Sequence, residues 1–124
     1  MDTELVPQPL DRVEILADRV AGFLRLSPDS PRLIGADAAV RWVAGRTMDR
    51  PVKQGRITAA EWSVREEMHM AVMALRRATT PDTAAYFTGV GVVLEWATGF
   101  TEGIPRWLIT YSEATSAPTE SAAS

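Results

Sequence analysis

The sequence predicts an all-α domain of four main helices, arranged as two helical hairpins. Apolar residues recur at helical spacing in four segments, and residues that cap or break helices separate these segments. The phrase GADAAVRWVAGRTMDRP begins at Gly35, and a matching phrase, GVGVVLEWATGFTEGIP, begins at Gly89. The repeat indicates that the second and fourth helices are two copies of one packing unit, related by a pseudo-two-fold axis.

The first two helices are predicted from their start signals. Asp11 followed by Glu14 favours a helix start, because acidic side chains stabilise the positive end of the helix dipole, and this helix should run to about Leu26. The second helix should begin at Pro31 with Ser30 as its N-cap. Proline lacks an N–H, and the first helical position does not need one.

The last two helices follow in the same way. Thr58 and Glu61 have the spacing of a capping box, which predicts the start of the third helix. One side of this helix should be apolar, with Val64, Met68, Ala71, Val72, Leu75 and Ala78. Thr80 is the expected N-cap of the fourth helix, although its GVGVV run would also suit a strand. The segment over 106–111, RWLITY, is compatible with helix, strand or loop.

The repeat places glycine and tryptophan at equivalent positions. In each copy the glycine lies seven residues before the tryptophan, which is two helical turns, so the two residues share a face. A glycine inside a helix costs about 1 kcal/mol relative to alanine, and close approach of two backbones would offset this cost. We therefore expect the two helices to cross at these glycines, with both tryptophans buried. The predicted structural residues are Gly35, Trp42, Gly45, Gly89, Trp96 and Gly99, of which Gly45 and Gly99 should be left-handed C-terminal caps.

Length and composition limit the domain organisation and the class of protein. The 124 residues suit one domain, expected over 10–111 with repeat units at about 27–51 and 80–105, a flexible leader over 1–9 and a disordered tail over 112–124. The chain has no cysteine, which excludes disulfides and thiolate metal sites. No segment reaches the roughly 20 apolar residues of a membrane span, and the acidic N-terminus lacks a secretory signal. These observations predict a soluble cytoplasmic protein without a membrane partner.

Two groups of residues are candidates for binding. Trp107, Leu108 and Tyr111 form an apolar cluster beyond the second repeat, where they could close the core or dock a partner. The loop over 46–57 could contact phosphate, or could be only a solvated connection, because its charged residues are Asp49 and the basic Arg46, Arg50, Lys53 and Arg56. The net charge of −3 argues against a dedicated nucleic-acid binder.

One pair of residues has the spacing of metal ligands. Glu66 and His69 match the E-x-x-H spacing of carboxylate di-iron bundles, but such sites need a second histidine and His69 is the only one. A histidine on a helix flank is therefore the expected reading, with a metal site as the alternative.

The pattern of an apolar helix that ends in W-x-x-G and is followed by a proline-containing loop covers Gly35–Pro51 and Gly89–Pro105. In this pattern the chain resembles small uncharacterised helical proteins of actinobacteria and their phages. The resemblance implies no activity, cofactor or catalytic residue for this chain.

Because no recognisable catalytic set is present, the sequence predicts a small non-catalytic binding protein that acts through protein–protein contacts or self-association, without a cofactor. Two alternatives remain open. One is a nucleic-acid-associated regulator that uses the basic loop over 46–57, and the other is a metal- or ligand-binding helical protein or enzyme that uses Glu66 and His69.

Overall fold

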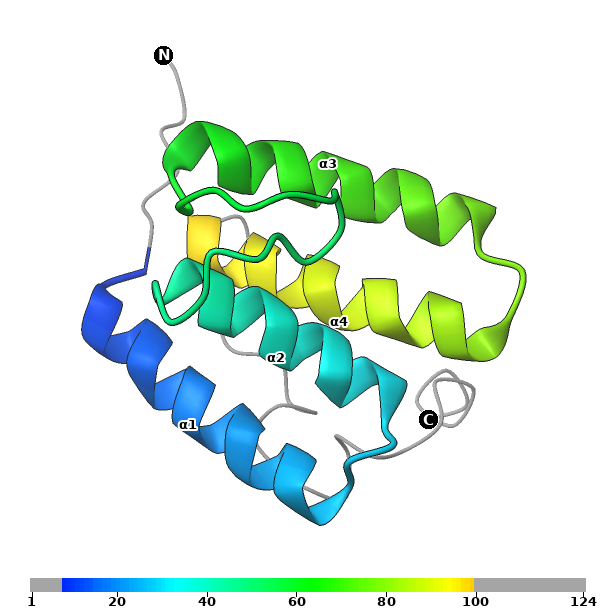
Figure 1. Cartoon of the computed structure of the whole chain (residues 1–124), viewed down its shortest axis with the longest axis horizontal. Coiled ribbons are helices and arrows are strands. Elements are labelled where there is room, and N and C mark those ends of the chain that lie inside the picture. The colour runs from blue at the N-terminus through cyan, green and yellow to red at the C-terminus, as the bar shows by residue number, and fades with distance from the viewer. Residues whose placement is uncertain (1–7, 100–124) are drawn as a thin grey trace.

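The fold is known from a computed structural model that describes residues 8–99. Within this range the chain forms four α-helices: α1 (Leu10–Leu26), α2 (Pro31–Val43), α3 (Glu61–Arg77) and α4 (Pro81–Thr98) (Figure 1). The described residues contain no strand, and a single isolated β-bridge joins Asp49 and Arg56. The predicted all-α class and the four helices are confirmed, including a helical α4 over the GVGVV run.

The central pair of the bundle is α2 and α4. Helix α1 packs against α2, and α3 packs against α4, so the spatial order is α1, α2, α4, α3. Figure 1 shows α2 and α4 running in the same general direction, while α1 and α3 run the opposite way along the two edges of the molecule. Each edge helix therefore packs against its neighbour in sequence, and the two inner helices pack against each other.

Helices α2 and α4 approach each other most closely at two glycines. A Cβ atom on Gly35 would lie 2.1 Å from the carbonyl oxygen of Tyr86, and one on Gly89 would lie 2.2 Å from the carbonyl oxygen of Arg32. Both distances are far shorter than any carbon–oxygen contact, so neither position accepts a side chain. Arg32 and Tyr86 each precede the glycine of their own helix by three residues, so the two contacts are reciprocal. The expected close approach of the two backbones at these glycines is confirmed.

The two repeat tryptophans lie in the core, as expected. Trp42 is 0% exposed and Trp96 is 1% exposed, and they are the largest fully buried side chains of the described residues. The indole Nε1 of Trp42 donates a hydrogen bond to the carbonyl oxygen of Ile57, 2.8 Å away. Burial of each ring against apolar neighbours makes both tryptophans structural residues.

The helix ends largely follow the predicted capping residues. The Ser30 hydroxyl accepts from the Leu33 N–H and the Thr80 hydroxyl accepts from the Thr83 N–H, each with a proline at the next position. After α2 and α4 the backbone is left-handed, with φ of +79° at Gly45 and +86° at Gly99. Both glycines therefore end helices as predicted, because side chains disfavour this conformation.

The predicted capping box at Thr58 and Glu61 is wrong. The backbone is still extended at Ala60, so α3 begins at Glu61 itself. Ser63, which is fully buried, replaces the box: its hydroxyl accepts from the Ala60 N–H and lies within hydrogen-bonding distance of the Thr58 carbonyl oxygen. A serine inside the first turn can satisfy the backbone before the helix, so the helix starts three residues after the predicted cap.

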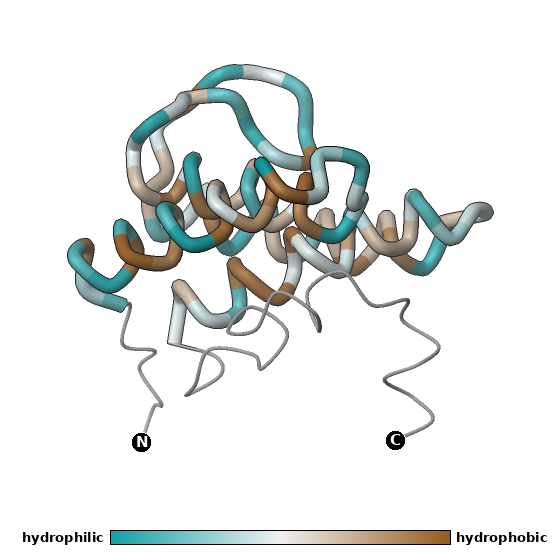
Figure 2. The backbone as a smooth tube through the Cα atoms, turned by 90° about the horizontal axis from the view of Figure 1, so that it is seen from below, coloured by the Kyte–Doolittle hydropathy of each residue, from teal (hydrophilic) through white to brown (hydrophobic). Residues whose placement is uncertain are grey.

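The connection between α2 and α3, residues 44–60, is the longest in the described chain. Figure 2 shows it arching over one side of the helices, with mainly hydrophilic residues along its course. It nevertheless contributes half-buried apolar side chains, among them Val52, Ile57 and Ala59, which pack against the core. The connection therefore closes one side of the bundle and contains the four basic residues that the sequence offers as a binding loop.

Candidate functional site

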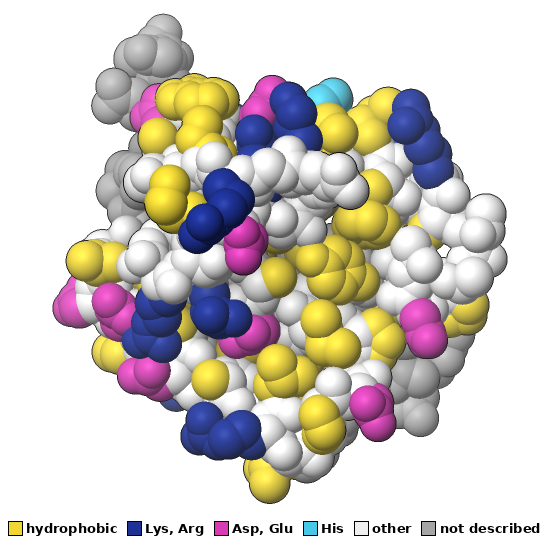
Figure 3. Space-filling model, in the orientation of Figure 1, with side chains coloured by type: hydrophobic (Ala, Val, Ile, Leu, Met, Phe, Trp, Pro, Cys, Tyr) yellow, Lys and Arg dark blue, Asp and Glu magenta, His cyan; other side chains and the backbone are white. Residues whose placement is uncertain are grey.

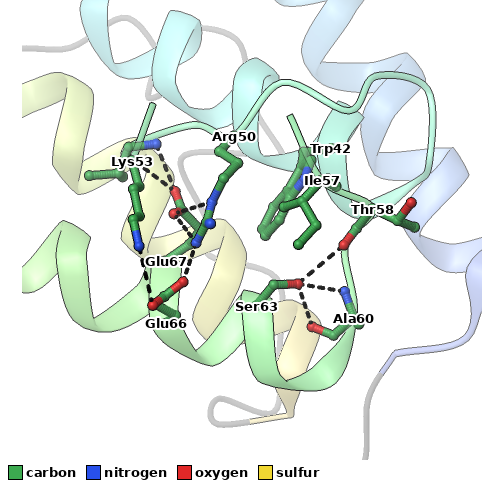
Figure 4. Close-up of polar contacts among 10 residues, drawn as sticks. Trp42, Arg50, Lys53, Ile57, Thr58, Ala60, Ser63, Glu66 and Glu67 are labelled. Atoms are coloured by element: carbon green, nitrogen blue, oxygen red, sulfur yellow. Dashed lines mark hydrogen bonds and ion pairs between the residues drawn. The ribbon is translucent and has the colours of Figure 1, made fainter. Parts of the chain in front are cut away.

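A buried carboxylate, Glu67, holds the basic loop against α3. Its side chain is 0% exposed and accepts a hydrogen bond from Arg50 Nε at 2.8 Å. The same carboxylate also accepts from the backbone N–H groups of Val52, at 2.8 Å, and Lys53, at 3.1 Å. Figure 4 shows these groups converging on Glu67. A buried carboxylate with a cationic partner and two amide donors is well satisfied, so this cluster fixes the loop in place.

Further contacts complete this attachment. The Arg50 guanidinium, 8% exposed, also pairs with Glu66, which has Lys53 as a second cation 3.6 Å away (Figure 4). The hydrogen bond from Arg50 lowers the pKa of Glu66, with a smaller contribution from Lys53. On the other side, the Tyr86 hydroxyl of α4 donates to the Pro51 carbonyl oxygen at 2.7 Å. Burial, and secondarily the negative charge of Glu67, raise the pKa of Tyr86.

The two remaining basic residues of the loop also have acidic partners. Arg46 pairs with Glu14 and Asp18 of α1, and Arg56 pairs with Asp49 across the isolated bridge. All four basic residues predicted as a phosphate-contacting loop therefore face carboxylates of this chain. Their positive charge is largely balanced within the molecule, which favours the alternative of a structural connection.

The predicted metal-ligand pair is divided between two environments. Glu66 is engaged with Arg50 and Lys53, whereas His69 is exposed on the outer side of α3. Among residues 8–99, no group of three or more histidine and acidic side chains is placed to hold a metal ion. Trp107, Leu108 and Tyr111 lie outside the described residues, so the structure does not bear on that predicted surface.

The outward face of α3 presents apolar and cationic side chains together. Five exposed residues of α3 follow one another at intervals of three or four positions and therefore lie on one side of the helix. They are Trp62, Arg65, His69, Val72 and Arg76. Trp62 is 59% exposed and Val72 is 39% exposed. Figure 3 shows basic and hydrophobic side chains interspersed along the edge of the molecule that α3 forms. We call these five residues the outer α3 face.

Part of this face was expected in the core. The sequence places Val72 and Leu75 on the buried side of the third helix, but both are 39% exposed. The buried residues of α3 are Ser63, Val64, Glu67 and Ala71, so Val64 and Ala71 lie in the core as expected. Because α3 is an edge helix that packs chiefly on α4, its apolar stripe is wider than the surface that covers it.

A small hollow adjoins the same helix. It has a volume of about 180 Å³ and lies where the end of α2, the start of α3 and the end of α4 meet. Val43, Val64 and Ala97 are among its apolar lining residues, and Glu61 and Arg65 also line it. The Gln8 backbone N–H closes another side by donating to the Ala97 carbonyl oxygen at 2.9 Å. Arg65 therefore belongs both to the hollow and to the outer α3 face.

Sequence reasoning missed Glu67 and Tyr86, which hold the loop. A signal for Glu67 was present, because it lies three residues after Val64 and four before Ala71 and is thus a charged residue within an apolar stripe. No comparable signal identifies Tyr86, whose role depends on the loop reaching it from a distant part of the chain.

Comparison of the chain with protein-family models, with curated proteins and with solved structures finds no match to any of them. Among the described residues, no helix is long and apolar enough to cross a membrane. The function must therefore be inferred from the geometry itself.

Proposed function

We propose that this protein is a small non-catalytic binding protein that acts through protein–protein contacts or self-association. The observation that carries the proposal is the outer α3 face, where the exposed Trp62 and Val72 lie on a helix with Arg65 between them and Arg76 one turn after Val72. Tryptophan and arginine are the residues most enriched at the energetic centres of protein interfaces. The hollow beside Arg65 adds a concave apolar feature of a size that suits one side chain of a partner.

The proposal extends to the architecture. The reciprocal contacts of Gly35 and Gly89 support two helical hairpins related by a pseudo-two-fold axis, with α2 and α4 as equivalent helices. In that arrangement the repeat serves packing between the hairpins, and the edge helices α1 and α3 are left to make external contacts.

Neither alternative function receives comparable support. A nucleic-acid regulator would need positive charge on the loop over 46–57, where Arg46, Arg50, Lys53 and Arg56 all have acidic partners. A metal protein based on Glu66 and His69 would have to remove Glu66 from two cations.

Site-specific photo-crosslinking tests the proposal. A photoreactive amino acid at Val72, on the outer α3 face, should form protein adducts, either with a second copy or with another protein, in cells that express the full chain. The same amino acid at Ile15 is the matched control, because Ile15 is an equally apolar, exposed residue on the other edge helix. The adducts at position 72 should be lost in Trp62→Ala, since the exposed indole contributes much of the contact area.

Two results would contradict the proposal. One is equal crosslinking from positions 15 and 72, and the other is crosslinking from position 72 that does not depend on Trp62. Sedimentation velocity of the purified chain separates the two versions of the proposal, because self-association raises the sedimentation coefficient with concentration and a foreign partner does not.

A further inference from the structure

The arginines of the outer α3 face differ in their partners from the basic residues of the loop over 46–57. Arg46, Arg50, Lys53 and Arg56 each lie within 4.0 Å of a carboxylate. In the described part of the chain, Arg65 and Arg76 take part in no ion pair and no side-chain hydrogen bond. The positive charges of the loop are therefore balanced by carboxylates, whereas those of Arg65 and Arg76 are not.

The surroundings of these two arginines contain few acidic groups. On α3, Glu66 and Glu67 are occupied by the loop, and the first-turn Glu61 is the remaining carboxylate. Arg77, next to Arg76, adds a further exposed cation at the end of the helix. The outer α3 face thus has a local excess of positive charge although the whole chain has a net charge of −3.

The distance between Arg65 and Arg76 along α3 limits which partner surface can pair with both arginines. Arg65 and Arg76 are eleven residues apart, which is a rise of about 16 Å. His69 and Val72 lie between them, and Trp62 lies one turn before Arg65. A complementary surface has two carboxylates about 16 Å apart with apolar side chains between and beside them.

We propose that the outer α3 face binds an acidic amphipathic segment of another protein, with carboxylates that pair with Arg65 and Arg76 and apolar side chains that cover Trp62 and Val72. This inference rests on the proposed function and specifies its partner. A protein segment fits better than a nucleic acid, because a sugar–phosphate backbone offers no aliphatic side chains to cover Val72.

A designed peptide serves as the probe. It is a fluorescein-labelled helical peptide of about 18 residues with two glutamates eleven residues apart and leucines on the same face. Its affinity for the full chain is measured by fluorescence anisotropy. In the double variant Arg65→Glu, Arg76→Glu the affinity should fall about tenfold or more, because like charges brought together across an interface repel.

A matched control separates local from overall charge. The double variant Arg12→Glu, Arg25→Glu changes the net charge by the same amount on α1, where both arginines are exposed and neither forms an ion pair with another described residue. It should bind the peptide with less than about a twofold change, since exposed charges more than about 10 Å away are screened at 0.1 M salt. A peptide with lysines in place of the glutamates should prefer the Arg65→Glu, Arg76→Glu variant over the unmodified chain.

Three results would overturn the inference. They are equal loss of affinity in the two double variants, no measurable binding of the acidic peptide, and tighter binding of duplex DNA of similar length than of the peptide. These outcomes are distinct from failure of the proposed function. If crosslinking from position 72 still depends on Trp62 while the charge reversals have no effect, the face is an interface whose partner is not acidic.

Discussion

Tyr86 connects α4 with α2 through its backbone and with the loop over 44–60 through its side chain. Its backbone carbonyl oxygen faces Gly35 of α2, and its hydroxyl donates to the Pro51 carbonyl oxygen of the loop. The ring also lies edge-on to Phe87 at a centroid distance of 5.3 Å. Because the hydroxyl is partly withdrawn from water and lies near Glu67, its neutral form is favoured in the folded state.

This environment predicts an alkaline limit to stability. Burial raises the pKa of Tyr86 above the ordinary value, so the unfolded chain loses this proton first as the pH increases through about 10. Proton loss from the unfolded state favours unfolding, and stability should therefore fall with rising pH above that point. In Tyr86→Phe this part of the decline should disappear, while stability at neutral pH drops by about 1 kcal/mol through loss of the hydrogen bond.

Urea unfolding at a series of pH values from neutral to alkaline measures both effects. Tyr111 is present in both proteins and contributes equally. If the free energy of unfolding fell equally with alkaline pH in the unmodified chain and in Tyr86→Phe, the Tyr86 hydroxyl would not control the pH dependence.

At the scale of elements, the connection over 44–60 has a fixed position because it is hydrogen-bonded to α3. Glu67 supplies the carboxylate, and Arg50 together with the Val52 and Lys53 amides supplies the donors. The loop in turn provides the Ile57 carbonyl that satisfies Trp42. Loss of the Glu67 charge would thus affect a core tryptophan of α2 as well as the loop.

We expect Glu67→Gln to destabilise the protein by about 3 kcal/mol, because it removes the fully buried one of the two carboxylates that pair with the buried Arg50 guanidinium. Glu66→Gln is the matched control. Glu66 contacts the same arginine but is 39% exposed, so water can replace its charge and the loss should be clearly smaller.

Chemical denaturation gives the free energy of unfolding for both variants, and trypsin reports on the loop. Cleavage after Lys53 or Arg56 should be faster in Glu67→Gln than in Glu66→Gln. Similar stability and similar cleavage in the two variants would argue against Glu67 as the residue that fastens the loop.

At the scale of the whole molecule, the arrangement of the bundle depends on how closely α2 and α4 can approach. The two glycines bring backbone against backbone at the centre, and the remaining helices are added on either side. The atoms that a new side chain would meet at either glycine belong to the backbone and cannot move aside as a flexible side chain could. An added methyl group would therefore push α2 and α4 apart and lower the free energy of unfolding.

Two glycines of one helix provide a direct comparison. Gly89→Ala should destabilise the protein by about 2 kcal/mol or more, because the new methyl group would collide with the backbone of Arg32 and Ala36. Gly91→Ala should stabilise it by about 0.5–1 kcal/mol, because nothing lies within 4 Å of its Cβ position and alanine favours the helix.

Thermal and urea unfolding measure both changes against the unmodified chain. If Gly89→Ala matched Gly91→Ala in stability, the two helices would not be in contact at this point, and the architecture described above would be wrong.

Local sequence was enough to predict the helices, the caps at Ser30 and Thr80, and the helix-ending glycines at Gly45 and Gly99. These features depend on interactions within a few residues, such as a hydroxyl that reaches an amide three positions later. The close backbone approach at Gly35 and Gly89 was also predictable, because a repeated helix-weakening residue needs a packing reason.

Tertiary structure alone decided the partners of the charged residues. The sequence shows four basic residues in one loop, but three of them pair with carboxylates of α1 or α3, up to 32 positions away along the chain, and Arg56 pairs with Asp49 of the loop itself. It also shows an apolar stripe on the third helix, but only the packing of α3 at an edge leaves Val72 uncovered beside unpaired arginines. Burial and ion pairing are properties of the assembled bundle, because they depend on which surfaces meet after the chain has folded.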